Sequence, residues 1–154
     1  MTEDFAFLDP GKLLDGNLDL ILARKTPADP VKRYVPQYEF EMRSASDGAP
    51  MGWLRFRVGD ADTILRYPGH IGYGVNPEFR GRRYAARSLR LIISLARAHS
   101  LTKLRITCHP DNMASRRTCE LAGAVFHEIV DIPASHEMHW KEGIHIACRY
   151  CIAL

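Results

Sequence analysis

The stretch "NPEFRGRRYAARSLRL", from Asn76 to Leu91, places five arginines around one glycine, directly before a run with helical periodicity. The tract before it, "HIGYGV" from His70 to Val75, reads as a short strand interrupted by glycines. A loop that leaves a strand and enters a helix exposes the first N–H groups of that helix, and the helix dipole adds positive charge there. This order of elements therefore predicts a site for phosphate or another anion.

The spacing of apolar residues predicts the elements on both sides of this stretch. Alternation with period two predicts seven strands, and a period near 3.6 predicts two helices. The strands are expected over residues 18–24, 37–44, 51–58, 70–75, 101–108, 124–133 and 144–154, and the helices over residues 84–99 and 113–122. This order predicts an α/β fold with one mixed sheet, helices on both faces and a central parallel strand pair. Gly72 and Gly74 predict a bulge at which that pair splays apart.

Length and composition predict a single globular domain over residues 1–154. The chain has 46% hydrophobic and 25% charged residues, an average globular composition. The N-terminus "MTEDFAFLDP" does not resemble a signal peptide, and the longest apolar tract, "LIISLA", is too short to span a bilayer. We therefore expect a cytoplasmic protein with no membrane contact, whose four cysteines stay reduced.

Two motifs resemble the GCN5-related N-acetyltransferase (GNAT) superfamily. The first is "RGRRYA", Arg80 to Ala85, because the family's loop pattern is Arg or Gln, two residues, Gly, one residue, then Gly or Ala. The second is "NMASRRTCELAGA", which has an Asn at the helix N-cap, a small residue three positions on and a Gly at the helix end. The resemblance runs from Pro50 to the C-terminus. Residues 1–49 diverge, because the family's two long helices are reduced here to "ADPVKRYVP".

The resemblance implies the acyl-CoA N-acyltransferase fold. It also implies transfer of acetyl from acetyl-coenzyme A to a primary amine by direct attack in a ternary complex, with no metal. Arg83 stands where the family usually has glycine, and this side chain predicts ordinary backbone angles at that position. Simple helix capping is the alternative explanation for Asn112 and, in part, for Ser115. The implied cofactor-binding residues are Val75, Arg80, Gly81, Arg82, Arg83, Tyr84, Ala85, Asn112 and Ser115.

Two residues are candidates for proton transfer. His70 stands near the family's usual place for a general base, and a structural histidine is an equal alternative. Cys119 stands where many members of the family carry a tyrosine as general acid, and a buried apolar filler is the alternative. The amine acceptor, a small molecule or a protein, is not identified, and a homodimer is left open. The candidate substrate contacts are Glu39, Glu41, His136, His139 and Trp140.

Two features of the sequence also suit other classes of function. A basic stripe of Arg87, Arg90 and Arg97 on the first helix suits nucleic acid, but no exposed aromatics are interleaved with it. Cys148 and Cys151 have the C-x-x-C spacing of a zinc or redox module, and His136, His139 and His145 lie close by in the sequence. Period-two alternation, however, places these two cysteines on opposite sides of a strand. Both classes are therefore disfavoured.

Overall fold

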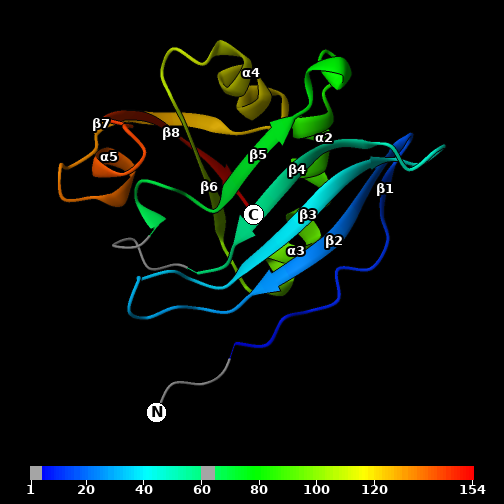
Figure 1. Ribbon diagram of the computed structural model, residues 1–154, viewed down its shortest axis with the longest axis horizontal. Coiled ribbons are helices and arrows are strands. Elements are labelled where there is room, and N and C mark those ends of the chain that lie inside the picture. Colours follow the sequence, from blue (N-terminus) through cyan, green and yellow to red (C-terminus); the bar gives the residue numbers. More distant parts are fainter. Residues whose placement is uncertain (1–4, 60–64) are drawn as a thin grey trace.

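The computed structural model describes residues 5–59 and 65–154 of the chain. Eight strands form one sheet in the order β1-β2-β3-β4-β5-β6-β8-β7 (Figure 1). The strands are β1 (Leu13–Asp15), β2 (Leu18–Thr26), β3 (Gln37–Ser44), β4 (Pro50–Arg57), β5 (Ile71–Val75), β6 (Lys103–Cys108), β7 (Val125–Asp131) and β8 (Ile146–Ala153). The helices are the 3-10 turn η1 (Pro77–Phe79), α2 (Tyr84–Leu91), α3 (Ile93–Ala98), α4 (Met113–Leu121) and α5 (Glu137–Trp140).

The predicted mixed sheet with a central parallel pair is confirmed. β5 and β6 run parallel, and the other neighbouring strands pair antiparallel. The predicted helix over residues 84–99 is interrupted at Ile92, whose ψ of −3° ends α2 before α3 begins. β1 and α5 were not predicted, because three or four residues are too few to establish a period.

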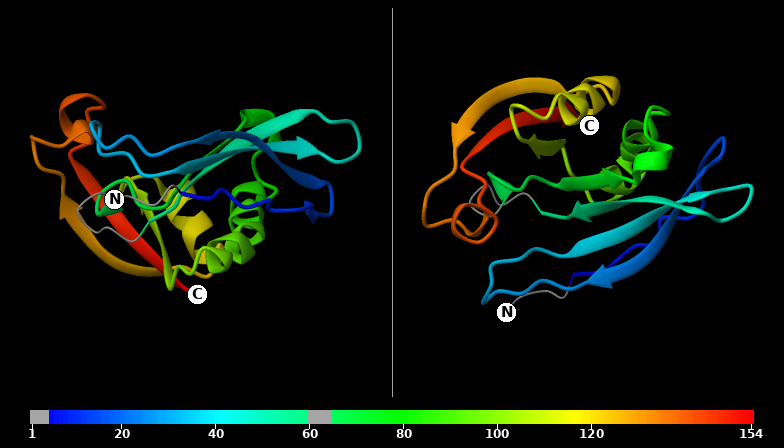
Figure 2. Two further views of the ribbon diagram at one scale, coloured as in Figure 1. Left: turned by 90° about the horizontal axis from the view of Figure 1, so that it is seen from below. Right: turned by 45° about the horizontal axis from the view of Figure 1, so that its top comes forward.

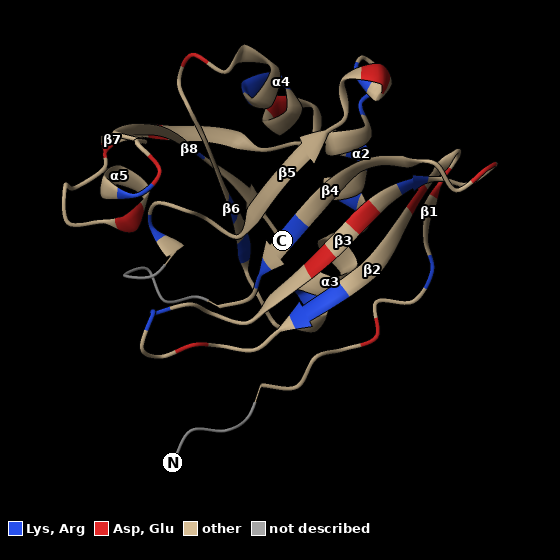
Figure 3. Ribbon diagram, viewed as in Figure 1, with Lys and Arg blue, Asp and Glu red and all other residues tan. Residues whose placement is uncertain are grey.

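Alternation along the strands gives the sheet one buried face and one more open face. Tyr38, Phe40 and Met42 of β3 are buried, in a core that also includes residues of α2, α3 and α4. The intervening Glu39 and Glu41 are only partly buried. Figure 3 shows these acidic positions along β3, between basic positions on β2 and β4. We call this second side the open face.

The loop that replaces the family's long helices holds no helix. Within residues 27–36, Asp29 and Tyr34 form an isolated bridge around a turn. α5 lies at the β7–β8 end of the molecule, close to this loop (Figure 2). Among the residues that the structure describes, no helix is long and apolar enough to cross a membrane.

Candidate active site

A gap opens between β5 and β6. Ile71 and Ile106 are the strand residues that pair, after which the two strands diverge toward their carboxyl ends (Figure 1). At the two ends of β5, the carbonyl of His70 accepts a hydrogen bond from Arg57 of β4, and the N–H of Asn76 donates one to Met51 of β4. Backbone groups alternate in direction along a strand, so those of Tyr73 and Val75 point into the gap. An extended ligand with amide groups could pair with them.

The glycines of β5 make room for a tryptophan. β5 pairs with β4 without a register shift, and the predicted splaying lies on its other edge, where β5 pairs with β6 at Ile71. A Cβ atom at Gly74 would lie 2.6 Å from Nε1 of Trp53, and one at Gly72 would lie 3.7 Å from the same ring. The indole of Trp53 therefore lies across β5 on the open face and is 42% exposed. The sequence did contain a signal for Trp53, because a large aromatic residue on the polar side of a strand indicates a contact on that side.

Ion pairs surround this indole on the open face. The Arg55 guanidinium lies 4.8 Å from the Trp53 ring centroid, and it is 3.5 Å from the carboxylate of Glu39. Arg24 lies at the same distance from Glu39. Glu41, directly opposite Trp53 in the sheet, pairs with Arg43 at 2.6 Å. The structure thus brings both predicted carboxylates to the open face, each already paired with arginine.

Two residues of the arginine-rich loop before α2 have left-handed backbone angles. Gly81 has φ +86°, and Arg83, the residue before the helix, has φ +63° and ψ +26°. The prediction of ordinary backbone angles at Arg83 is wrong. The loop keeps the conformation that glycine favours, and a side chain adopts it at a cost of roughly 1–2 kcal/mol.

The first turn of α2 has backbone amides without an acceptor in the helix. Its first backbone hydrogen bond joins the N–H of Arg87 to the carbonyl of Arg83, so Tyr84, Ala85 and Ala86 have N–H groups without an acceptor inside the helix. Arg80, just upstream, donates from Nε to the Val75 carbonyl at 3.2 Å. Positive charge and free amides therefore meet where β5 ends, which is the arrangement that binds phosphate.

Replacing Arg83 by glycine is expected to raise the free energy of unfolding by about 0.5–1 kcal/mol, because it removes the left-handed strain at some cost in chain entropy. The measurement is urea denaturation. The matched control is Arg82→Gly, at a position without a positive φ, which should lose stability. Equal losses in the two variants would contradict strain at Arg83.

An ion pair anchors α2 to the first hairpin. Arg87 Nη2 donates to the Asp15 carbonyl, and Arg87 Nε donates to the carboxylate of Asp15 at 2.8 Å. This hydrogen bond lowers the pKa of the Asp15 carboxyl. Arg90 donates to the Leu121 carbonyl at the end of α4. Two of the three arginines proposed for a nucleic-acid stripe therefore bind within the protein, although Arg90 is exposed, as Arg97 is.

The start of α4 is tied to β5. Asn112 Oδ1 accepts the N–H of Ser115 at 3.0 Å, so the capping explanation accounts for Asn112. The Tyr73 hydroxyl lies 3.0 Å from Ser115 Oγ, 3.2 Å from the Ser115 carbonyl and 3.9 Å from Cys119 Sγ. Sequence reasoning missed Tyr73, because its partners are more than 40 residues away.

The two residues proposed for proton transfer are both buried. His70 is 2% exposed, with Nε2 2.6 Å from the Gly59 carbonyl and Nδ1 accepting the backbone N–H of Arg105. Cys119 is fully buried, and its hydrogen bond to Cys108 together with burial raises the pKa of its thiol. These surroundings favour a structural role for both residues.

The C-x-x-C cysteines face opposite sides of β8. Cys148 is fully buried and pairs with Cys108, whereas Cys151 is partly exposed and pairs with Arg105. The described part of the chain contains no group of three or more His, Cys, Asp or Glu side chains that could hold a metal ion. A shared zinc site at these cysteines is incompatible with this register.

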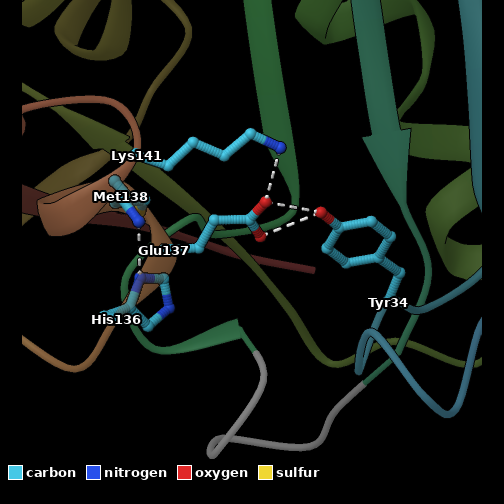
Figure 4. A network of polar contacts seen from close by, with 5 residues as sticks. All are labelled: Tyr34, His136, Glu137, Met138 and Lys141. Atoms are coloured by element: carbon cyan, nitrogen blue, oxygen red, sulfur yellow. Dashed lines mark hydrogen bonds and ion pairs between the residues drawn. The ribbon is translucent and has the colours of Figure 1, made fainter.

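α5 connects to the loop over residues 27–36 (Figure 4). The Tyr34 hydroxyl lies 2.8 Å from both carboxylate oxygens of Glu137, and Lys141 lies 3.1 Å from the same carboxylate. His136 caps α5 by accepting the N–H of Met138. We call the Tyr34–Glu137 contact the tether.

Of the other predicted substrate contacts, His139 stacks on His145 with centroids 4.0 Å apart, and Trp140 is 66% exposed.

The tether should weaken in acid. The hydrogen bond from Tyr34, followed by that from Lys141, lowers the pKa of the Glu137 carboxyl. The contact therefore contributes fully above the ordinary glutamate pKa of about 4.3 and is lost as pH falls through the lowered folded value. Hydrogen exchange of the backbone amides in residues 27–36, corrected for intrinsic rates, should become faster as pH falls through the folded pKa of Glu137. Glu137→Gln should show fast exchange already at pH 7, and equal protection in both proteins there would contradict the tether.

Comparisons with known proteins agree with this geometry. The model of the acetyltransferase (GNAT) domain family matches residues 19–125. One similar solved structure is RimL, the ribosomal L7/L12 alpha-N-protein acetyltransferase in complex with coenzyme A. It has 14% identity and a TM-score of 0.66, with 93% of this chain and 98% of that chain covered. Another is the microcin C7 self-immunity acetyltransferase MccE in complex with acetyl-CoA and AMP, with 16% identity, a TM-score of 0.59 and coverage of 77% and 61%.

A third solved structure is an acetyl transferase from Salmonella typhimurium that modifies the N-terminal serine of ribosomal protein L7/L12. It has 16% identity, a TM-score of 0.58 and coverage of 77% of this chain and 64% of that chain. No curated protein matches the sequence significantly. The structural likenesses establish the fold, and the family model covers more than half of the chain. The chain therefore belongs to the GNAT acetyltransferase family.

Proposed function

We propose that this protein moves acetyl from acetyl-coenzyme A to a primary amine by direct attack in a ternary complex, with residues 1–154 acting as one N-acetyltransferase domain. The observation that carries the proposal is the continuity between the open gap beside β5 and the unpaired amides at the start of α2. A ligand with a phosphate at one end and amides along an extended arm matches both features.

The cofactor would lie along β5. Its pyrophosphate would bind the amides and positive charge of residues 80–86, and its pantetheine arm would pair with the backbone of Val75 and Tyr73. The thioester would then lie toward Ile71, where the gap closes. Both the RimL and MccE structures hold coenzyme A or acetyl-CoA, which supports this assignment. A backbone N–H in the gap would stabilise the oxyanion formed during attack.

The acceptor would approach from the open face, because α2 and α4 occupy the other side of the gap. Trp53, Glu39 and Glu41 lie on that face, and the segment with His136, His139 and Trp140 lies at its β7–β8 end. Since two similar structures are acetyltransferases of a ribosomal protein, a protein N-terminus belongs in the acceptor panel beside small amines. We place the reaction in the cytoplasm, with neutral amine as the attacking species.

Calorimetric titration with acetyl-CoA, followed by thiol-release assays over a panel of amines and N-terminal peptides, tests this proposal. Acetyl-CoA should bind stoichiometrically and raise the melting temperature. Arg97→Ala is the matched control, since it removes an exposed arginine outside the loop and should leave binding unchanged. Absence of binding at millimolar acetyl-CoA, or loss of a nucleic-acid interaction in Arg97→Ala, would overturn acetyl transfer as the function.

A further inference from the structure

Tyr73 connects β5 to α4. Side chains alternate along β5, so Tyr73 lies on the same side as the buried Ile71, whereas Gly72 and Gly74 face Trp53. The phenol is half-buried, and its hydroxyl is held by the carbonyl and hydroxyl of Ser115. The hydroxyl therefore links β5 to α4 from a strand residue two positions beyond Ile71, where the gap closes.

A thioester in the gap would place its sulfur near this hydroxyl. The phosphate end of the ligand belongs beyond Val75, where the arginine-rich loop begins, so the opposite end of its extended arm points toward Ile71. The path from Val75 to Ile71, four residues along the strand, is about 13 Å long. Tyr73 lies midway along that path and directs its side chain to the same side as α4. When the C–S bond breaks, the departing thiolate needs a hydrogen-bond donor at this place.

The other acidic groups near this hydroxyl are less suited to donate. Cys119 already directs its hydrogen bond to Cys108, and this bond and burial raise the pKa of its thiol. Burial raises the pKa of Tyr73 as well, so acidity does not separate the two groups and the choice between them rests on position. Either hydroxyl of the Tyr73–Ser115 pair can donate to the other. If the Ser115 hydroxyl donates to Tyr73 Oη, the phenol donates to the Ser115 carbonyl at 3.2 Å and can turn from that contact toward a ligand.

We propose that the Tyr73 hydroxyl, positioned by Ser115, is the catalytic proton donor to the sulfur of coenzyme A. The inference rests on the proposed function. As the amine nitrogen bonds to the carbonyl carbon, the C–S bond breaks and its electron pair stays on sulfur. The proton of Tyr73 passes to that sulfur, the proton lost by the amine passes to water, and the phenolate recovers a proton from solvent. Cys119 supplies the small side chain against which the phenol packs.

Tyr73→Phe tests the inference by removing one oxygen atom. We expect kcat to fall about 10²- to 10³-fold, with the acetyl-CoA dissociation constant changed less than about threefold. Tyr150→Phe is the matched control, because Tyr150 is also buried and its hydroxyl accepts a hydrogen bond from Arg116. It should keep kcat within about threefold of the unaltered protein.

A double variant that moves the phenol from β5 to α4 tests whether activity can be restored. Tyr73→Cys combined with Cys119→Tyr exchanges the two side chains between β5 and α4 and conserves total volume. We expect the exchange variant to regain at least about tenfold in kcat over Tyr73→Cys alone, because either element can direct a phenol into the gap. If the exchange variant does not fold, Tyr73→Phe alone decides.

Two results separate failure of the inference from failure of the function. Tyr73→Phe with undiminished kcat, or with losses in kcat and cofactor affinity of equal size, would overturn the role of Tyr73 and leave acetyl transfer in place. Failure of the unaltered protein to bind acetyl-CoA would overturn the function itself.

Discussion

Gly52→Ala should lower the free energy of unfolding by about 3 kcal/mol or more, as overpacking against backbone does at its upper end. A Cβ atom at this position would lie 2.3 Å from the Gly74 carbonyl oxygen and 3.1 Å from the Val75 Cα. These atoms belong to β5, which cannot move aside without breaking its pairing with β4. Chemical denaturation measures the loss. Because β5 forms one wall of the gap, acetyl-CoA affinity should fall with it.

Gly72→Ala is the matched control on the same strand pair. Its Cβ would meet only the Trp53 ring, at ordinary van der Waals distance. Stability should change by less than about 1 kcal/mol. Gly74→Ala should lie between the two, since its clash is with the movable Trp53 ring, and the cost should shrink when Trp53 is also replaced by alanine. Equal effects of Gly52→Ala and Gly72→Ala would contradict the close backbone approach.

Ala85→Pro should weaken acetyl-CoA binding by about 10- to 150-fold. The substitution deletes one amide N–H in the first turn of α2, where proline is tolerated and no intrahelical hydrogen bond is lost. A hydrogen bond to a charged phosphate contributes about 1.5–3 kcal/mol, which sets the expected range. Calorimetric titration measures the affinity, and a melt without ligand checks that the helix is intact.

Ala85→Ser keeps the amide and provides the comparison. It should bind acetyl-CoA within about threefold of the unaltered protein. If the proline and serine variants bind equally well, the phosphate does not use this amide, and the cofactor assignment to the start of α2 would have to move.

Local patterns predicted most of the fold. β3 was predicted over residues 37–44 and was found there. Tyr38, Phe40 and Met42 alternate with charged residues, and this pattern is typical of a strand with one buried face. The parallel pair followed from a helix joining two strands. The loop before α2 could also be interpreted from the sequence, because glycine and arginine directly before a helix are typical of an anion-binding site.

Features that depend on distant contacts were not predictable in this way. The left-handed angles of Arg83 are imposed by the surrounding loop against the preference of its side chain. Gly74 is required by a tryptophan on the neighbouring strand, which sequence periodicity alone does not reveal. The partners of Tyr73 are set by how α4 packs against β5, a tertiary relation that alternation along either element leaves open.

The position of Trp53 makes the protein its own optical reporter. The chain has two tryptophans, and the other, Trp140, is 66% exposed on α5. In a Trp140→Phe background the intrinsic fluorescence would come from the single indole that lies across Gly72 and Gly74. Its emission would respond to any molecule that displaces water from the open face beside the gap. Acceptors could then be screened by quenching or a spectral shift, without labels and without waiting for turnover.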